Sequence, residues 1–199
     1  MQGRSNKCSA FFINPATIHV VELIELAYSK DWDKIRAYSR QPDSKAFQFM
    51  TISALLSPER IFINTDISSK KRLLEFISDN IADQFNLSQT TIYTNLLDRE
   101  RLGSTGLGNG FAIPHARLNN LDATIACFIR LNQPVKFEAP DNKPVDLVFA
   151  IIIPEKATDE HLEILSSLAK IFSQAETCDA IRSAGSSDEI ARVIQMAEQ

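Results

Sequence analysis

The stretch "PVDLVFAIIIP", residues 144–154, decides the fold. Its interior is apolar from Leu147 to Ile153 and is rich in β-branched side chains, which favour a strand. A strand that is apolar on both faces is typical of the centre of a sheet covered by helices on each side. The apolar run is far too short to cross a bilayer as a helix. The stretch therefore predicts a buried central strand.

Three more segments, all before this strand in the chain, have the composition of strands, being short and rich in apolar and β-branched or aromatic residues. We expect strands at residues 60–64, 111–114 and 123–131, with a further short one at 135–137. Pro and Asp-Asn turn signals surround the last of these.

Helical periodicity occupies the remaining segments. One helix is predicted over residues 68–85 with Ser68 as its N-cap, and a second begins near Ser88 and ends before Gly103. The C-terminal part is predicted to be helical, with breaks near Ala175 and Gly185. This order predicts an α/β fold, a mixed β-sheet flanked by helices.

Composition and charge exclude several classes of protein. The chain has 199 residues, 44% of them hydrophobic and 23% charged, the balance of a soluble globular protein. A net charge of −4 argues against nucleic-acid binding, which needs a basic face. The three cysteines, Cys8, Cys127 and Cys178, form no C-x-x-C pair, so we expect reduced thiols in a cytoplasmic protein. No spacing typical of a metal site occurs, and we expect neither a metal nor a cofactor.

Residues 1–49 differ from the rest of the chain. They contain one candidate amphipathic helix, but no strand on which it would pack. Two interpretations stay open, a genuine N-terminal extension and an early start assignment with translation beginning at Met50. Either way, we expect the folded domain to occupy residues 50–199.

The stretch "GSTGLGNGFAIPHAR", residues 103–117, holds four of the chain's six glycines and ends beside a histidine. Gly-rich loops often direct backbone amides at phosphate. The chain has no Gly-Lys pair, which excludes a Walker loop, and the glycine spacing after a helix does not match the dinucleotide fingerprint. Both nucleotide-binding interpretations therefore fail.

The alternative is that a phosphoryl group is carried on the protein itself. Imidazole is a competent nucleophile at neutral pH. An extended backbone through this stretch would direct His115 and Arg117 to the same side, placing a cation near a phosphorylated ring. From spacing alone, a purely structural histidine stays open as the other interpretation.

"ERLGSTGLGNGFAIPHA", residues 100–116, resembles the active-histidine signature of enzyme IIA components of the bacterial phosphoenolpyruvate-dependent sugar phosphotransferase system, fructose–mannitol group (type 2). It most resembles the nitrogen-regulatory branch, and the likeness runs from about Met50 to the C-terminus. Phe111 departs from the pattern, where the family usually has an aliphatic residue. The resemblance implies the mannitol-type enzyme IIA fold, in agreement with the prediction above.

The resemblance also implies roles for individual residues. His115 corresponds to the histidine phosphorylated by a histidine-containing phosphocarrier protein, with Nε2 suggested as the acceptor. Arg99 corresponds to an arginine that stabilises the phosphoryl group, and His161 to a second active-site histidine. Candidates for the phosphate-binding loop are Ser104, Thr105, Gly106, Gly108, Asn109, Gly110 and Arg117.

Each of these residues has a structural alternative. His161 falls in an apolar helical stripe, where a hydrogen-bonded core histidine is the alternative. Arg99 would also be favourable as a solvated cation at a helix C-terminus, and Arg117 as a surface charge on a strand. The polar loop residues would otherwise satisfy the turn.

The function implied is that of a nitrogen-regulatory enzyme IIA, which regulates unidentified targets according to its phosphorylation state. One alternative is uptake of fructose or mannitol, with transfer to an enzyme IIB. The other is a non-catalytic binding module on the same fold. We expect no nucleic acid as a partner and no insertion into a membrane.

Overall fold

The computed structural model describes residues 51–156 and 160–199, with the backbone alone for residues 160–162. The predicted extension, residues 1–49, lies outside the described residues. The described helices are α3 (Ile52–Leu55), a 3-10 turn η2 (Pro58–Arg60), α4 (Lys70–Phe85), α5 (Gln89–Arg101), α6 (Glu160–Phe172), α7 (Ala175–Ser183) and α8 (Ser187–Ala197). The described strands are β1 (Ile61–Thr65), β2 (Gly106–Gly108), β3 (Phe111–Ala112), β4 (His115–Leu118), β5 (Ile125–Val135) and β6 (Val145–Pro154).

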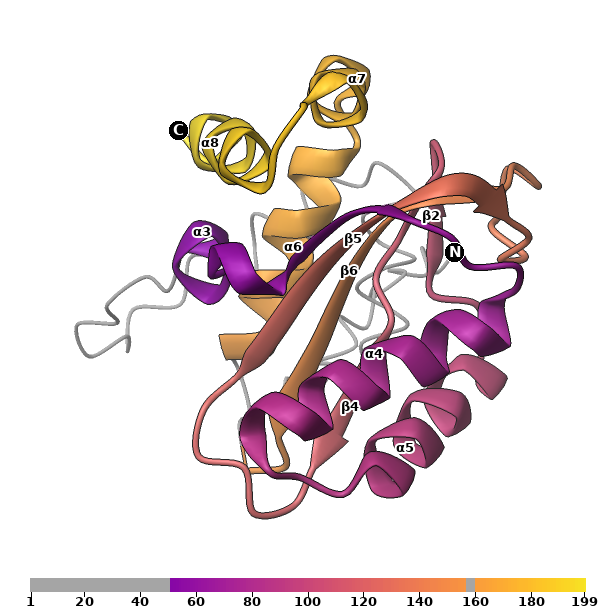
Figure 1. Ribbon diagram of the computed structural model, residues 1–199, viewed down its shortest axis with the longest axis vertical. Helices are drawn as coiled ribbons and strands as arrows, with labels where there is room; N and C mark the ends of the chain where they lie inside the picture. The colour runs from indigo at the N-terminus through magenta and orange to yellow at the C-terminus, as the bar shows by residue number, and fades with distance from the viewer. Residues whose placement is uncertain (1–50, 157–159) are drawn as a thin grey trace, which may run out of the picture.

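The six strands form one mixed sheet in the order β1-β5-β6-β3-β2, with β4 also paired to β6 (Figure 1). β6 pairs antiparallel with β5 and parallel with both β3 and β4. The side chains from Leu147 to Ile153 are almost completely buried. The predicted central strand is therefore confirmed.

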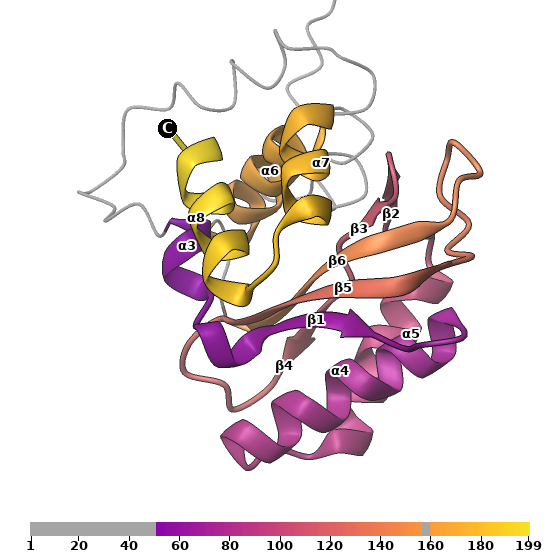
Figure 2. The ribbon, with the colours of Figure 1, turned by 45° about the horizontal axis from the view of Figure 1, so that its top comes forward.

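Helices cover both faces of the sheet. Figure 2 shows α4 and α5 on one face, and α3, α6, α7 and α8 on the other. Alternate residues of β6 supply the two cores: Phe149 and Ile151 face the layer of α6, whereas Ala150 and Ile152 face the layer of α4. Full burial of one such isoleucine or phenylalanine stabilises the fold by roughly 1.5–3 kcal/mol. The predicted mixed sheet flanked by helices is confirmed.

Two predicted boundaries were wrong. Ser69 rather than Ser68 caps α4, because its extended backbone lets the Ser69 side chain accept the amide of Arg72 at 3.3 Å. No separate strand forms at 135–137, because β5 continues to Val135 through a register shift after Arg130. Pro134 is tolerated at this irregularity because its missing amide is not needed there.

Two of the cysteines lie within the described residues. Cys127 and Cys178 are buried, free thiols, and burial raises the pKa of Cys127 to about 12. In residues 51–156 and 160–199, no helix combines the length and the apolar character that a membrane crossing requires.

The feature that positions the site is a strand interrupted at Ile113 and Pro114. β3 and β4 flank this break and pair with β6 at the same residue offset, Phe111 with Leu147 and His115 with Ile151. The Pro114 carbonyl accepts the Ile151 amide at 2.9 Å, so the ladder continues across the break. β2 covers the outer edge only beside β3. Beyond that point, the outer edge of the strand faces α5.

Candidate functional site

His115 is the first residue of β4 and is only 5% exposed. Its Nδ1 lies 2.8 Å from the Ile113 carbonyl oxygen. A carbonyl oxygen only accepts hydrogen bonds, so Nδ1 carries the proton. The lone pair of the ring is therefore on Nε2.

Arg99, in the last turn of α5, contacts that lone pair. Its Nε donates to His115 Nε2 at 2.9 Å, and its Nη1 donates to the Gly103 carbonyl at 2.9 Å. One turn earlier on the same helix face, Asn95 donates to the Arg117 carbonyl of β4 at 2.7 Å. Two side chains of α5 thus cover the otherwise open edge of β4 and align it with the helix.

The electrostatics of the pair favour an anion at Nε2. Burial lowers the pKa of the Arg99 guanidinium from its ordinary value, and the neighbouring Glu100 carboxylate opposes that shift. Arginine nevertheless stays protonated near neutral pH. A fixed cation therefore lies beside a neutral imidazole whose nucleophilic nitrogen faces it. This arrangement suits transfer of an anionic group to Nε2.

The first half of the glycine-rich loop is bound to the protein itself. The Ser104 hydroxyl donates to the Phe137 carbonyl at 2.5 Å and accepts the Gly106 amide at 3.1 Å. The Thr105 amide and hydroxyl both donate to the Glu100 carboxylate. These contacts fix the course of the loop between α5 and β2.

The second half of the loop contacts β6 and α7. The Asn109 amide donates to Asp141 at 2.9 Å, and the Asn109 carbonyl accepts from Arg182 at 2.8 Å. The Gly110 carbonyl accepts the amides of Asp146 and Leu147. Gly108 ends β2, with a positive φ of 93°. Phosphate binding by these residues stays a prediction.

Two of the glycines have packing reasons. A Cβ on Gly106 would lie 2.9 Å from the Ala139 Cβ. A Cβ on Gly110 would lie 2.6 Å from both the Arg182 guanidinium and the Asp146 carboxylate, and Gly110 has a φ of +79°. Side chains at either position would displace neighbours that hold the loop.

Arg117 follows the predicted alternation. Ala116 and Leu118 pack on the α4 side of the sheet, so His115 and Arg117 take the opposite face of β4. Arg117 is exposed, and its Nη1 donates to the Glu155 carbonyl at 3.4 Å. Its role towards a phosphoryl group stays a prediction.

His161 lies in the first turn of α6, the helix that covers the same face of the sheet as His115. Its side chain is outside the described part of the structure, so its place beside His115 stays a prediction. Among the described residues, no group of three or more His, Cys, Asp and Glu side chains is arranged to hold a metal ion.

Phe111, the departure from the family pattern, is fully buried. Its ring stacks on that of Phe172, with centroids 3.7 Å apart. The larger side chain is therefore accommodated by α6.

Four groups of the site were missed in the sequence. They are the Ile113 carbonyl, Asn95, Glu100 and Lys70. Asn95 had a detectable signal, because it lies four residues before Arg99 on the same helix face. Glu100 also had one, since an acidic residue in the last turn of a helix opposes the macrodipole and needs cationic or donor partners.

The sequence matches a known family and individual relatives. The family model described as "Phosphoenolpyruvate-dependent sugar phosphotransferase system, EIIA 2" matches residues 54–197. The chain is 41% identical over 144 residues to the nitrogen regulatory protein of Pseudomonas aeruginosa, covering 72% of this chain and 94% of that protein.

The similar solved structures include the following two. The nitrogen regulatory protein IIA-Ntr of Neisseria meningitidis is 40% identical with a TM-score of 0.70, over 72% of this chain and 98% of that one. The mannitol IIA of Escherichia coli shares the fold, with a TM-score of 0.61 at 22% identity over 70% of this chain and 98% of that one. The family match spans most of the sequence and the whole described sheet, so the chain belongs to the EIIA 2 family of the phosphoenolpyruvate-dependent sugar phosphotransferase system.

Proposed function

We propose that the chain accepts a phosphoryl group on Nε2 of His115 from a histidine-containing phosphocarrier protein. The observation that carries the proposal is the pair of hydrogen bonds on the imidazole. Nδ1–H is donated to the Ile113 carbonyl at 2.8 Å, and the Nε2 lone pair faces Arg99 at 2.9 Å. One nitrogen is therefore occupied by the backbone, and the other is available as nucleophile once Arg99 moves.

The transfer step follows from this arrangement. The Nε2 lone pair attacks the phosphorus of the phosphohistidine of the carrier, and the phosphorus–nitrogen bond of the donor breaks as the new one forms. The donor imidazole keeps the electron pair of the broken bond. The proton stays on Nδ1 of His115, where the Ile113 carbonyl stabilises the positive charge that develops on the ring.

Arg99 changes its acceptor during this step. At rest its Nε donates to the Nε2 lone pair, which the new bond consumes. The same guanidinium then donates to the phosphoryl oxygens, while Gly103 retains its Nη1 contact. In this proposal, His161 and exposed groups of the loop and Arg117 supply further contacts to the phosphoryl group.

We further propose that the phosphorylated and free forms regulate target proteins, as a nitrogen-regulatory enzyme IIA. Support comes from the 41% identity to a protein of that name, over nearly the whole length of the relative. The targets are recognised by a surface that includes the acceptor, because that is where the two forms differ in charge.

Intact mass spectrometry tests the acceptor. The protein is incubated with phosphoenolpyruvate, enzyme I and the phosphocarrier, and we expect one acid-labile phosphoryl group on the wild type and none on His115→Ala. His19→Ala is the matched control and should be labelled like the wild type. No gain on the wild type, under conditions that label another enzyme IIA, contradicts the proposal and favours a binding module.

A second measurement separates regulation from uptake. The labelled protein is mixed with a fructose- or mannitol-type enzyme IIB. We expect the phosphoryl group to remain on His115. Rapid transfer to the enzyme IIB would assign the chain to uptake instead.

A further inference from the structure

Glu100 is a buried carboxylate that the transfer step does not use. It follows Arg99 in the last turn of α5, and its side chain is 6% exposed. The C-terminal end of a helix is the negative end of its dipole, where a carboxylate is unfavourable. Burial there demands partners that donate to it.

All described partners of the Glu100 carboxylate are donors. The Thr105 amide lies 3.1 Å from Oε2, and the Thr105 hydroxyl lies 2.5 Å from the same oxygen. Lys70 Nζ, from the first turn of α4, lies 3.0 Å from Oε1. The carboxylate thus ties α4 to the loop that follows α5.

Lys70 has a second carboxylate partner, Glu138, at 2.5 Å, and also donates to the Phe137 carbonyl at 3.2 Å. Burial disfavours the charged form of Lys70, but its hydrogen bonds to Glu138 and Glu100 outweigh burial, so the pKa of Lys70 lies above its ordinary value. The first turn of a helix disfavours a cation. The position of Lys70 in the first turn of α4 is therefore explained by its two carboxylate partners and not by the helix dipole.

A chain of hydrogen bonds leads from Glu100 to the imidazole. The carboxylate holds Thr105, and the Thr105 carbonyl accepts the Ile113 amide at 2.9 Å. The Ile113 carbonyl then accepts His115 Nδ1–H at 2.8 Å. The start of the same loop is held by α5 as well, since the Gly103 amide donates to the Glu100 carbonyl at 3.3 Å.

We propose that Glu100, paired with Lys70, is a positioning residue that keeps His115 in the Nδ1–H tautomer. By holding Thr105, it fixes Ile113 so that the Ile113 carbonyl is presented to Nδ1, which leaves the lone pair on Nε2. The inference rests on the proposed function in taking Nε2 as the acceptor. The tautomer itself is a property of the unphosphorylated protein.

Glu100→Gln is the informative variant. A glutamine keeps the shape of the side chain, but its NH2 group would face either the Thr105 amide or the Lys70 ammonium, and neither can accept a hydrogen bond. We expect this mismatch to loosen Thr105 and Ile113, so that the ring of His115 populates both neutral tautomers. Imidazole ¹⁵N chemical shifts, assigned by comparison with His115→Ala, distinguish protonated from unprotonated nitrogens.

The rate of transfer provides the second readout. Only the Nδ1–H tautomer presents the Nε2 lone pair, so kcat falls in proportion to the fraction of that tautomer. With the two tautomers about equally populated, we expect kcat to fall about twofold, with KM for the phosphocarrier unchanged. Glu138→Gln is the matched control, because it removes the other carboxylate partner of Lys70. The Glu138 side chain is 80% exposed. It should retain the tautomer and kcat of the wild type.

Several outcomes overturn the inference. A Glu100→Gln protein with a single Nδ1–H tautomer does so, whether or not its stability or its rate has changed, because Glu100 is then only a structural anchor. If Glu100→Gln does not fold, Thr105→Val takes its place, since it removes the 2.5 Å hydroxyl contact and keeps the amide. An unchanged tautomer in folded Thr105→Val overturns the inference equally. If the wild type takes up no phosphoryl group, the proposed function is overturned instead. The tautomer measurement still decides whether Glu100 positions the ring of His115.

Discussion

The guanidinium of Arg99 bonds two different acceptors, one on the imidazole and one on the backbone of the loop. The planar fork of arginine makes both contacts with a single fixed geometry, which an ammonium on a flexible stem does not reproduce. The contact to the Gly103 carbonyl keeps the guanidinium beside the ring when the ring lone pair is consumed and the Nε contact is lost. Arg99 is therefore prepared for an anion before the anion arrives.

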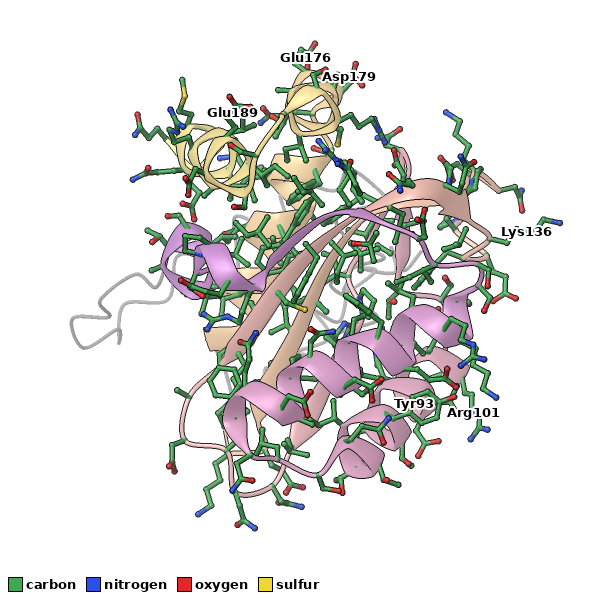
Figure 3. All side chains as sticks on the ribbon, in the orientation of Figure 1. Tyr93, Arg101, Lys136, Glu176, Asp179 and Glu189 are labelled. Atoms are coloured by element: carbon green, nitrogen blue, oxygen red, sulfur yellow. The ribbon has the colours of Figure 1, made fainter. Side chains whose placement is uncertain are left out.

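The first prediction concerns Arg99→Lys. The substitution retains the charge but loses the fork, so we expect the single-turnover rate of His115 labelling to fall by about 10²-fold. Quenched-flow mass spectrometry measures that rate. Arg101→Lys is the control, because Arg101 projects away from the domain and pairs only with Asp98 among its described contacts (Figure 3). Equal rates for Arg99→Lys and wild type would contradict the assigned role.

At the scale of residues, the sequence and its resemblance to a family identified the two side chains that meet, Arg99 and His115. The second group that selects the tautomer, beside Arg99, was not predictable. It is the backbone carbonyl of Ile113, and every residue carries such a group, so no sequence pattern marks it. The partners of Glu100 were hidden for a related reason, since Lys70 approaches it from a different helix.

Lys70 is the first residue of α4, and Arg99 lies in the last turn of α5. The positions of these two side chains therefore depend on where each helix begins or ends. The N-cap of α4 immediately precedes Lys70. It is Ser69, one residue after the predicted cap, and its hydroxyl accepts the Arg72 amide. Adjacent serines are equivalent in the sequence, and only the local backbone distinguishes them.

The second prediction tests this cap. Ser69→Ala should lower the free energy of unfolding by about 1 kcal/mol, because it leaves an amide of the first turn without its partner. Ser68→Ala, one residue earlier and exposed, should change it by less than about 0.5 kcal/mol. Urea denaturation followed by circular dichroism measures both. A larger loss of unfolding free energy in Ser68→Ala than in Ser69→Ala would show that Ser68 is the N-cap, as predicted from the sequence.

At the scale of elements, the long segments and the short strands β1 and β3 were predicted, whereas β2 and the full length of β5 were not. The apolar run of β6 and the periodicity of α4 and α5 are local signals. β2 was missed because a three-residue, glycine-rich strand has no such signal and is defined only by its pairing with β3. β5 was cut short because Pro134 is a turn signal that the register shift overrides.

The two ends of the described domain meet in space. Glu198, after α8, accepts the backbone amide of Ile52 and, at 2.6 Å, the hydroxyl of Ser53, in the first turn of α3. Ile52 and Leu55 are buried in the core beneath α6 and α8. Both faces of the sheet are therefore covered by residues from Thr51 onward.

The third prediction follows from this closure. A chain beginning at Met50 should unfold at the same urea concentration as the full chain and accept the phosphoryl group at the same rate. A chain beginning at Ser57 is the control. It lacks the buried Ile52 and Leu55 and should lose about 2 kcal/mol or more. Loss of stability or labelling in the first truncation would show that residues 1–49 contribute to the domain.

β3 and β4 pair with β6 at one constant residue offset, and this limits where residues can be inserted or deleted. Because β3 and β4 keep one offset against β6, adding or deleting a single residue between Phe111 and His115 would turn the imidazole to the other face of the sheet. The turn at residues 119–124, which joins β4 to β5, carries no such restriction. Insertions are therefore tolerated on one side of the acceptor and forbidden on the other, which tells an engineer where a tag or sensor can be placed.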